Sequence, residues 1–495
     1  MQKRPRSLAL GAHGRRGRLI AVVLGLLMPL PALAGLPPEN RCPAVGVSPT
    51  GRAGDAVLRR MRQGGQIPYD LMPAIRDLLP AEIWQNRRVF FYPGMQMVIG
   101  DCHRRYPVPE FYSEATASFS DEVSVDSDGN LEGYVAGIPF PPNEIDPASR
   151  DAGVKWAWNL EHRFRGAGAH GNFRIADIPG ARGKLHHYEG TFFFIQTRHR
   201  ADLPDSGYRV PESDEGLWVA GGRFSEPFDA RHLAWRQIRP AEAHENYTVS
   251  DRTFVYVPTM RKVRRAATPW VDGMYVPRFR VGGDVGGGGL AVAAGGNEFV
   301  GPQGAINPTS AMSVHQSEHL PRGFTLLALR PNAYVWRLKG EREVLAPINV
   351  SRSGYPISKG REFGPHGLSV ASDRWDVRWA VVLEGRIRGG NHDYQTITLY
   401  VDYQTLQPLY VITKASRGRI LDVGIPLHRF SGDVLNYPSW PSGEESNVFD
   451  PVAEVFYRVS DDSGWRRESY NTRSTPAEDR VRRRFMSTDF LVRGR

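Results

Sequence analysis

The chain has 495 residues, of which 41% are hydrophobic and 11% aromatic, and its formal net charge is +10. The first 34 residues contribute six basic residues and no acidic ones, so the remaining chain carries a net charge of only +4. That mild excess excludes the dense basic surface of nucleic-acid-binding proteins, and we expect no nucleic-acid partner. Beyond residue 34, no stretch is long and apolar enough to cross a bilayer, and the composition is that of a globular protein.

The chain opens with a basic segment that is followed by an apolar run, LIAVVLGLLMPLPALA. This order is typical of a secretory signal peptide, so we expect residues 1–34 to be cleaved after Ala34 and the protein to reach the periplasm. A transmembrane anchor is the alternative. The run has about 16 residues, however, is interrupted by Pro29 and Pro31, and is shorter than the roughly 20 residues of a spanning helix.

Residues 35–130 are predicted to form an N-terminal arm with helices and the first strands. Apolar residues recur at helical spacing over 53–63 and 69–80, which predicts a helix in each stretch. The arm contains both cysteines of the chain, Cys42 and Cys102, which an oxidising periplasm would allow to pair. We therefore predict one disulfide that ties the arm to the body, with two free buried thiols as the alternative.

Residues 131–495 are predicted to form the main domain, a large antiparallel sheet. A helix is expected over 147–166, after which stretches rich in aromatic and β-branched residues begin. Three of these follow one another with short connections between 374 and 416, which favours an antiparallel meander over parallel crossover units. Their alternation predicts one face packed on apolar groups and one face in water. The expected strands lie at 186–199, 252–258, 374–387, 394–405, 407–416, 418–430 and 453–460.

The glycine-rich segments do not form a nucleotide-binding motif. GAGAHG at 166–171 has the spacing of a dinucleotide fingerprint, but a helix is expected before it and a strand after it, which reverses the required order. A second segment, near 282–305, lacks the Lys-Ser/Thr ending of a phosphate-binding loop. Its length and composition predict a mobile loop or flap.

HQSEH at 315–319 is the strongest candidate for catalytic chemistry. Its spacing matches the inverted zinc motif, in which His315 and His319 would bind the metal beside a carboxylate base. Such motifs lie on long helices, whereas Pro308 and Pro321 limit this stretch to about a dozen residues. We therefore expect a polar turn, no metal, no cofactor and no enzymatic activity, with a metal-dependent periplasmic hydrolase as the alternative function.

Five phrases of the sequence together resemble one known family. They are GIPFPPNEIDP (137–147), KWAWNLEHRFRG (155–166), RTFVYVPTMRKVRRA (252–266), AYVWRLKGEREVLAPIN (333–349) and RWDVRWAVVLEGRI (374–387). In this order they resemble a proteobacterial family of uncharacterised periplasmic proteins, described as similar to outer-membrane lipoprotein-sorting proteins. The resemblance implies a β-rich α+β fold: a large curved antiparallel sheet, or half-open β-barrel, with helices packed on its concave side. It also implies a concave face that accepts acyl chains, and no catalytic residues.

The strand RTFVYVP shows how such a sheet could hold a ligand. Phe254 and Tyr256 project to one side of the strand, where they can line the concave face or, alternatively, pack on the helices as ordinary core. Aromatic residues of other elements are expected on the same face. The predicted lining is Trp158, Phe192, Phe194, Phe254, Tyr256, Trp375 and Trp379.

The sequence thus predicts a periplasmic binding or carrier protein for a lipid, a lipoprotein acyl chain or another hydrophobic molecule. The resemblance implies an envelope exporter or an outer-membrane protein as the protein partner. Basic residues just past the RTFVYVP strand are predicted to form a rim that meets a membrane surface or this partner. They are Arg261, Lys262, Arg264 and Arg265.

Overall fold

The structure is a computed structural model of the chain. It describes residues 36–42, 52–178, 185–211, 216–258, 261–267, 273, 327–351, 363–371, 373–389, 394–459, 464–476, 479–487 and 489–492. The chain divides into a short unit, Met1–Pro37, and a large unit, Pro38–Arg495, to which the elements below belong. The predicted signal peptide at 1–34, the predicted flap at 282–305 and HQSEH at 315–319 lie outside the described residues.

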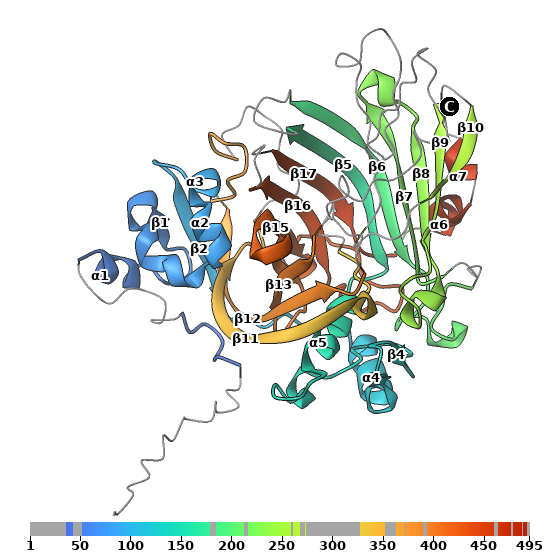
Figure 1. Ribbon diagram of the computed structural model, residues 1–495, viewed down its shortest axis with the longest axis horizontal. Helices are drawn as coiled ribbons and strands as arrows, with labels where there is room; N and C mark the ends of the chain where they lie inside the picture. The colour runs from blue at the N-terminus through green and yellow to red at the C-terminus, as the bar shows by residue number, and fades with distance from the viewer. Residues whose placement is uncertain are drawn as a thin grey trace, which may run out of the picture. The chain divides into compact units, whose positions relative to one another are not determined.

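The large unit is built on one sheet of 15 strands (Figure 1). They are β1 (Gln66–Pro68), β2 (Gln96–Cys102), β5 (Gly168–Ile178), β6 (His186–Gln196), β7 (Trp218–Glu226), β8 (Ala234–Arg239), β9 (Arg252–Val257), β10 (Lys262–Ala267), β11 (Tyr334–Ala346), β12 (Arg374–Ile387), β13 (Thr396–Asp402), β14 (Pro408–Lys414), β15 (Ile420–Phe430), β16 (Phe449–Arg458) and β17 (Trp465–Arg473). A separate hairpin consists of β3 (Ser124–Val125) and β4 (Leu131–Glu132).

The strand order is β1-β2-β12-β13-β14-β15-β16-β17-β5-β6-β7-β8-β9-β10, and β11 pairs with β12 beside this path. The pairing of β12 with β2 is parallel, and the other pairings of this sheet are antiparallel. Among the described strands, β1 and β10 end the order and do not pair with each other, so the sheet stays open. The predicted β-rich antiparallel architecture is confirmed, and β12 has the predicted bounds, 374–387.

The α-helices and the longest 3₁₀ helix each have at most ten residues. They are α1 (Arg52–Leu58), η1 (Tyr69–Leu78), α2 (Ala81–Gln85), α3 (Arg87–Phe90), α4 (Glu110–Phe119), α5 (Ala152–Glu161), α6 (Asp479–Met486) and α7 (Asp489–Val492). The helix predicted at 69–80 forms as the 3₁₀ helix η1, since Pro73 inside it has no N–H and its ring crowds the preceding turn. Among the described residues, no helix combines the length and hydrophobicity needed to span a membrane.

Both faces of the sheet are covered around β14. Tyr410 and Ile412 belong to one buried apolar cluster together with Ile83 of α2, whereas Val411 between them belongs to a second cluster with Trp156 of α5. Successive side chains of a strand point to opposite faces, so helices lie against both sides of this part of the sheet. The prediction of one face in water is therefore wrong here.

Charged residues of β12 that the alternation assigned to a wet face are buried instead. Asp376 accepts hydrogen bonds from the Asp101 N–H (3.0 Å) and the Tyr106 hydroxyl (2.9 Å). Arg378 donates to both carboxylate oxygens of Asp402, at 2.7 and 2.9 Å. Burial raises the pKa of Asp376 to about 6. The charged residues that alternate along β12 are therefore buried and paired with other polar groups, because a charge inside a protein needs a partner.

Cys42 and Cys102, the pair predicted to bond, are joined by a disulfide with a Cα–Cα distance of 5.0 Å. Cys102 is the last residue of β2, whose parallel neighbour is β12. The bond spans 60 residues of sequence and ties the start of the arm to β2, the neighbour of the terminal strand β1 in the sheet. Closing a loop of that length in the unfolded chain stabilises the folded state.

Candidate functional site

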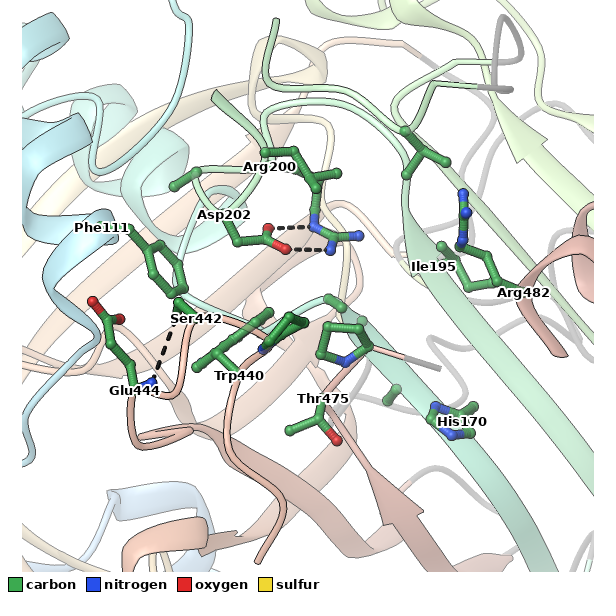
Figure 2. Close-up of a pocket in the computed structure, with 18 of the residues that line it drawn as sticks. Phe111, His170, Ile195, Arg200, Asp202, Trp440, Ser442, Glu444, Thr475 and Arg482 are labelled. Carbon is green, nitrogen blue, oxygen red and sulfur yellow. Dashed lines mark hydrogen bonds and ion pairs between the residues drawn. The ribbon is translucent and has the colours of Figure 1, made fainter. Parts of the chain in front are cut away.

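A cavity of about 480 Å³ lies at the ends of β5 and β6 (Figure 2). We call it the Trp440 pocket and define it by five of the residues that line it: Phe111, Phe194, Arg200, Trp440 and Arg482. Its volume falls in the range of small-molecule sites, which are typically roughly 300–1,000 Å³. Most of the residues that line it are apolar, so we take it as the candidate binding site.

The strands form the first wall, which contains Gly168, Phe194 and Ile195. Gly168 has a φ of +115°, and a Cβ there would lie 1.9 Å from the Phe194 carbonyl oxygen. Only glycine permits this approach, which starts the pairing of β5 with β6 beside the cavity. The Phe194 ring is fixed by the Trp218 ring, whose centroid is 4.9 Å away. This wall is consequently rigid and apolar.

A loop between β6 and β7 forms the second wall. Arg200 is 5% exposed and donates two hydrogen bonds to the Asp202 carboxylate, at 2.7 and 2.6 Å. The backbone N–H of Arg200 donates to the backbone carbonyl oxygen of Tyr208 at 2.9 Å, so the two ends of the loop are joined. Leu203 and Val210 of this loop line the cavity. The internal ion pair therefore holds apolar side chains against the site.

Two aromatic rings form the third wall. Trp440 is 3% exposed and packs edge to face on Phe111 of α4, with the ring centroids 5.0 Å apart. Its indole N–H donates to the Ser446 carbonyl oxygen at 3.1 Å, and its backbone N–H donates to that of Glu444 at 2.9 Å. These bonds fix the Trp440 ring, and the edge-to-face contact is a stable arrangement for two rings.

Basic residues lie at the remaining side of the pocket. Figure 2 shows Arg482 and His170 across the cavity from Phe111 and Trp440. His170 lies on β5, and burial together with the charge of Arg473 lowers its pKa. The pocket therefore has an aromatic side and a basic side.

Three histidines form a second cluster of titratable groups. The ring centroids of His162, His199 and His244 lie 5.0 to 5.6 Å apart, and the Tyr134 ring lies 4.0 Å from His162. Burial lowers the pKa of all three imidazoles, to about 4 for His199. Within the described ranges, no group of three or more His, Cys, Asp or Glu residues is arranged to hold a metal ion. At neutral pH this cluster consists of packed, neutral rings.

The structure does not bring the seven predicted lining residues together. One apolar cluster contains Trp375, a second Trp158, a third Phe192 and Phe194, and a fourth Tyr256 with Phe254 packed against it. Trp379 is half-buried and its indole N–H donates to Glu341 at 2.7 Å. Of the seven, Phe194 lines the Trp440 pocket.

The four predicted rim residues lie on and beside β10. Arg261, Lys262, Arg264 and Arg265 are exposed, and β10 is the last strand in the described sheet order. They do not line the Trp440 pocket. Charged side chains are a common feature of edge strands, where they oppose pairing with other chains.

Sequence patterns did not point to the residues that define the Trp440 pocket, apart from Phe194. Phe111 lies more than 300 residues before Trp440 and Arg482 in the chain, and the three residues share no spacing. One signal was available: Trp440 lies in YPSWPSG, a turn-rich stretch with no strand or helix to account for a large apolar ring.

Several solved structures are similar to this chain. A domain from Vibrio parahaemolyticus, described as an outer-membrane lipoprotein-sorting protein domain, is 12% identical and covers 70% of this chain and 100% of its own, with a TM-score of 0.36. A DUF1329 family protein from Desulfovibrio piger is 12% identical and covers 70% and 99%, with a TM-score of 0.37. A LolA superfamily protein from Nitrosomonas europaea is 13% identical and covers 67% and 94%, with a TM-score of 0.29.

Comparison with models of protein families assigns the sequence to one family. No curated protein matches the chain. The family described as "Protein of unknown function (DUF1329)" matches residues 75–277 and 324–472. These ranges contain all five phrases that carry the resemblance noted in the sequence, and that resemblance is confirmed. Because the match covers more than half of the chain, the protein belongs to the DUF1329 family, whose function is unknown.

Proposed function

We propose that this protein is a periplasmic carrier that binds a hydrophobic molecule in the Trp440 pocket. The observation that carries the proposal is the pocket itself: an apolar cavity whose aromatic and aliphatic side chains are held in place by their own hydrogen bonds and ring contacts. Such a lining recognises shape and hydrophobicity rather than a reacting group.

The energy of binding in such a pocket comes from removing apolar surface from water. Each methylene group that is buried contributes about 0.8 kcal/mol, so an alkyl chain gains affinity with every carbon the pocket can hold. The walls are already ordered by the Arg200–Asp202 pair and the Trp440 hydrogen bonds, which lowers the entropy that binding must overcome.

Two observations support an exported carrier over a cytoplasmic one. The Cys42–Cys102 disulfide suits an oxidising compartment, as the basic and apolar start of the sequence does. The exposed basic residues at β10 would favour contact with anionic lipid at a membrane surface. An envelope exporter or outer-membrane protein would then supply or receive the ligand.

Replacing Leu203 with glutamine tests the pocket directly. Leu203 is half-buried and lines the cavity, so an amide there would lose apolar contact and bring an unpaired polar group against the ligand. We expect the affinity for the neutral fluorescent probe N-phenyl-1-naphthylamine to fall about tenfold. Fluorescence titration of the purified protein measures this change.

The matched control is Leu71→Gln, because Leu71 is also half-buried but lies on η1 and does not line the pocket. This variant should bind the probe like the wild type. Native mass spectrometry of protein purified from the periplasm should also detect a bound lipid. The proposal fails if no lipid co-purifies and the wild type binds neither the probe nor added alkyl compounds.

A further inference from the structure

The Trp440 pocket has two sides of opposite chemical character, and this polarity restricts the ligand. In Figure 2, Glu444 lies on the side of Phe111, whereas Arg482 and His170 lie across the cavity. A purely apolar molecule would have no preferred direction in such a site. A molecule with one charged end would be oriented by the difference between the two sides of the pocket.

The aromatic side would repel an anion. Glu444 is the carboxylate that lines the pocket there, and one of its oxygens is buried without a hydrogen-bond partner in the described structure. The other carboxylate of the lining, Asp202, has both oxygens bonded to the Arg200 guanidinium, so that pair has no net charge. Glu444 and Arg482 are the remaining charged side chains of the described lining, and Figure 2 shows them on opposite sides of the cavity.

The basic side is positioned by helix α6. Its Phe485 ring stacks on Phe193 of β6, with the centroids 4.5 Å apart, and lies 6.4 Å from the His170 ring. These contacts hold the helix against β5 and β6, and Arg482 of the same helix lines the pocket. Arg473 is the cross-strand neighbour of His170 and adds a further positive charge nearby.

We propose that the ligand of the Trp440 pocket is an anionic amphiphile, an alkyl chain that ends in a carboxylate or phosphate group. Its chain lies against Phe111, Phe194 and Trp440, and its head group is bound by Arg482 beside His170. A guanidinium suits this role because its planar set of N–H donors matches a carboxylate or phosphate. This inference rests on the proposed function, since it names the ligand class for the same pocket.

The experiment compares three ligands with the same twelve-carbon chain: dodecanol, dodecanoate and dodecyl phosphate. Each competes with N-phenyl-1-naphthylamine for the wild type, for Arg482→Gln and for Arg483→Gln. Arg483 is the matched control because it is the next residue of α6, is exposed and does not line the pocket. The wild type and Arg483→Gln should bind at least one of the two anions about tenfold more tightly than dodecanol.

In Arg482→Gln this preference should disappear, so that dodecanol and both anions bind with similar affinity. Preference for only one anion would identify the head group as carboxylate or phosphate. If dodecanol and both anions bind the wild type equally, or if Arg482→Gln and Arg483→Gln behave alike, the inference is overturned while the carrier function stands. If none of the three displaces the probe, the inference is likewise overturned, and if the wild type does not bind the probe either and no lipid co-purifies, the proposed function itself fails.

Discussion

Replacing Asp251 with asparagine is expected to lower the free energy of unfolding by about 3–5 kcal/mol. Asp251 is buried between two guanidiniums: Arg239 Nε lies 3.2 Å and Arg330 Nη2 lies 2.5 Å from its Oδ1. Both arginine side chains are 1% exposed. Burial alone would raise the pKa of Asp251, but the two arginine charges lower it below its ordinary value. A neutral amide would remove the negative charge that lies between these two buried cations.

This triad joins parts of the chain that are distant in sequence. Arg239 of β8 donates to the carbonyl oxygens of Ala328 and Leu329, at 2.8 and 3.1 Å, and Arg330 donates to that of Tyr247 at 2.7 Å. Loss of the carboxylate would therefore weaken the attachment of the 327–330 segment to β8 and β9, in addition to the electrostatic cost.

Urea denaturation at pH 7 measures the effect, and Glu226→Gln is the control. Glu226 pairs with Arg231 at 2.9 Å, but both side chains are more than 40% exposed, so this variant should change the free energy by less than about 1 kcal/mol. If the free energy of unfolding of Asp251→Asn lies within about 1 kcal/mol of the wild-type value, the carboxylate is not needed to stabilise the triad.

The antiparallel meander could be predicted from the sequence because each of its strands carries its own signal. β12, β13, β14 and β15 combine β-branched and aromatic residues with short connections, and adjacent pairing follows from those two facts. The order of the distant strands could not be predicted in this way. β17 lies beside β5, nearly 300 residues earlier in the chain, and no local pattern indicates that pairing.

The face that each strand presents was harder to predict than the strand itself. Asp376 and Arg378 alternate with Trp375 and Val377, and alternation alone does not distinguish a solvated face from a buried, paired one. The partners of Arg378 and Asp376, such as Asp402 and Tyr106, come from other elements, so only the tertiary structure reveals the pairing. The same limit applies to the pocket, whose walls come from five segments.

Lowering the pH from 7 to 4.5 is expected to cost the wild type roughly 3 kcal/mol more of its free energy of unfolding than it costs the His428→Leu variant. His428 lies on β15, is 1% exposed, and has no hydrogen-bond partner for either ring nitrogen in the described structure. Burial, with a contribution from the charge of Arg163, lowers its pKa from 6.5 to about 3.

The direction of the effect follows from proton binding. Between pH 6.5 and 3, His428 takes up a proton in the unfolded chain but not in the folded protein, so acidification favours unfolding. Its stabilising contribution is complete above pH 6.5 and is lost as the pH falls. Buried carboxyls oppose it: burial raises the pKa of Asp376, Asp422 and Asp450 to about 6, so they stabilise the fold as the pH drops from 6 to 4.

Comparing His428→Leu with the wild type isolates the histidine, because both proteins contain the same three aspartates. Urea denaturation at pH 7 and pH 4.5 gives the two free-energy differences, and His366→Leu is the control since His366 is exposed. At pH 7 the His428→Leu variant should be at least as stable as the wild type, because leucine leaves no buried nitrogen unpaired. Equal losses on acidification for wild type and His428→Leu would mean that the His428 ring takes up its proton in the folded state, with a water or a carboxylate within reach.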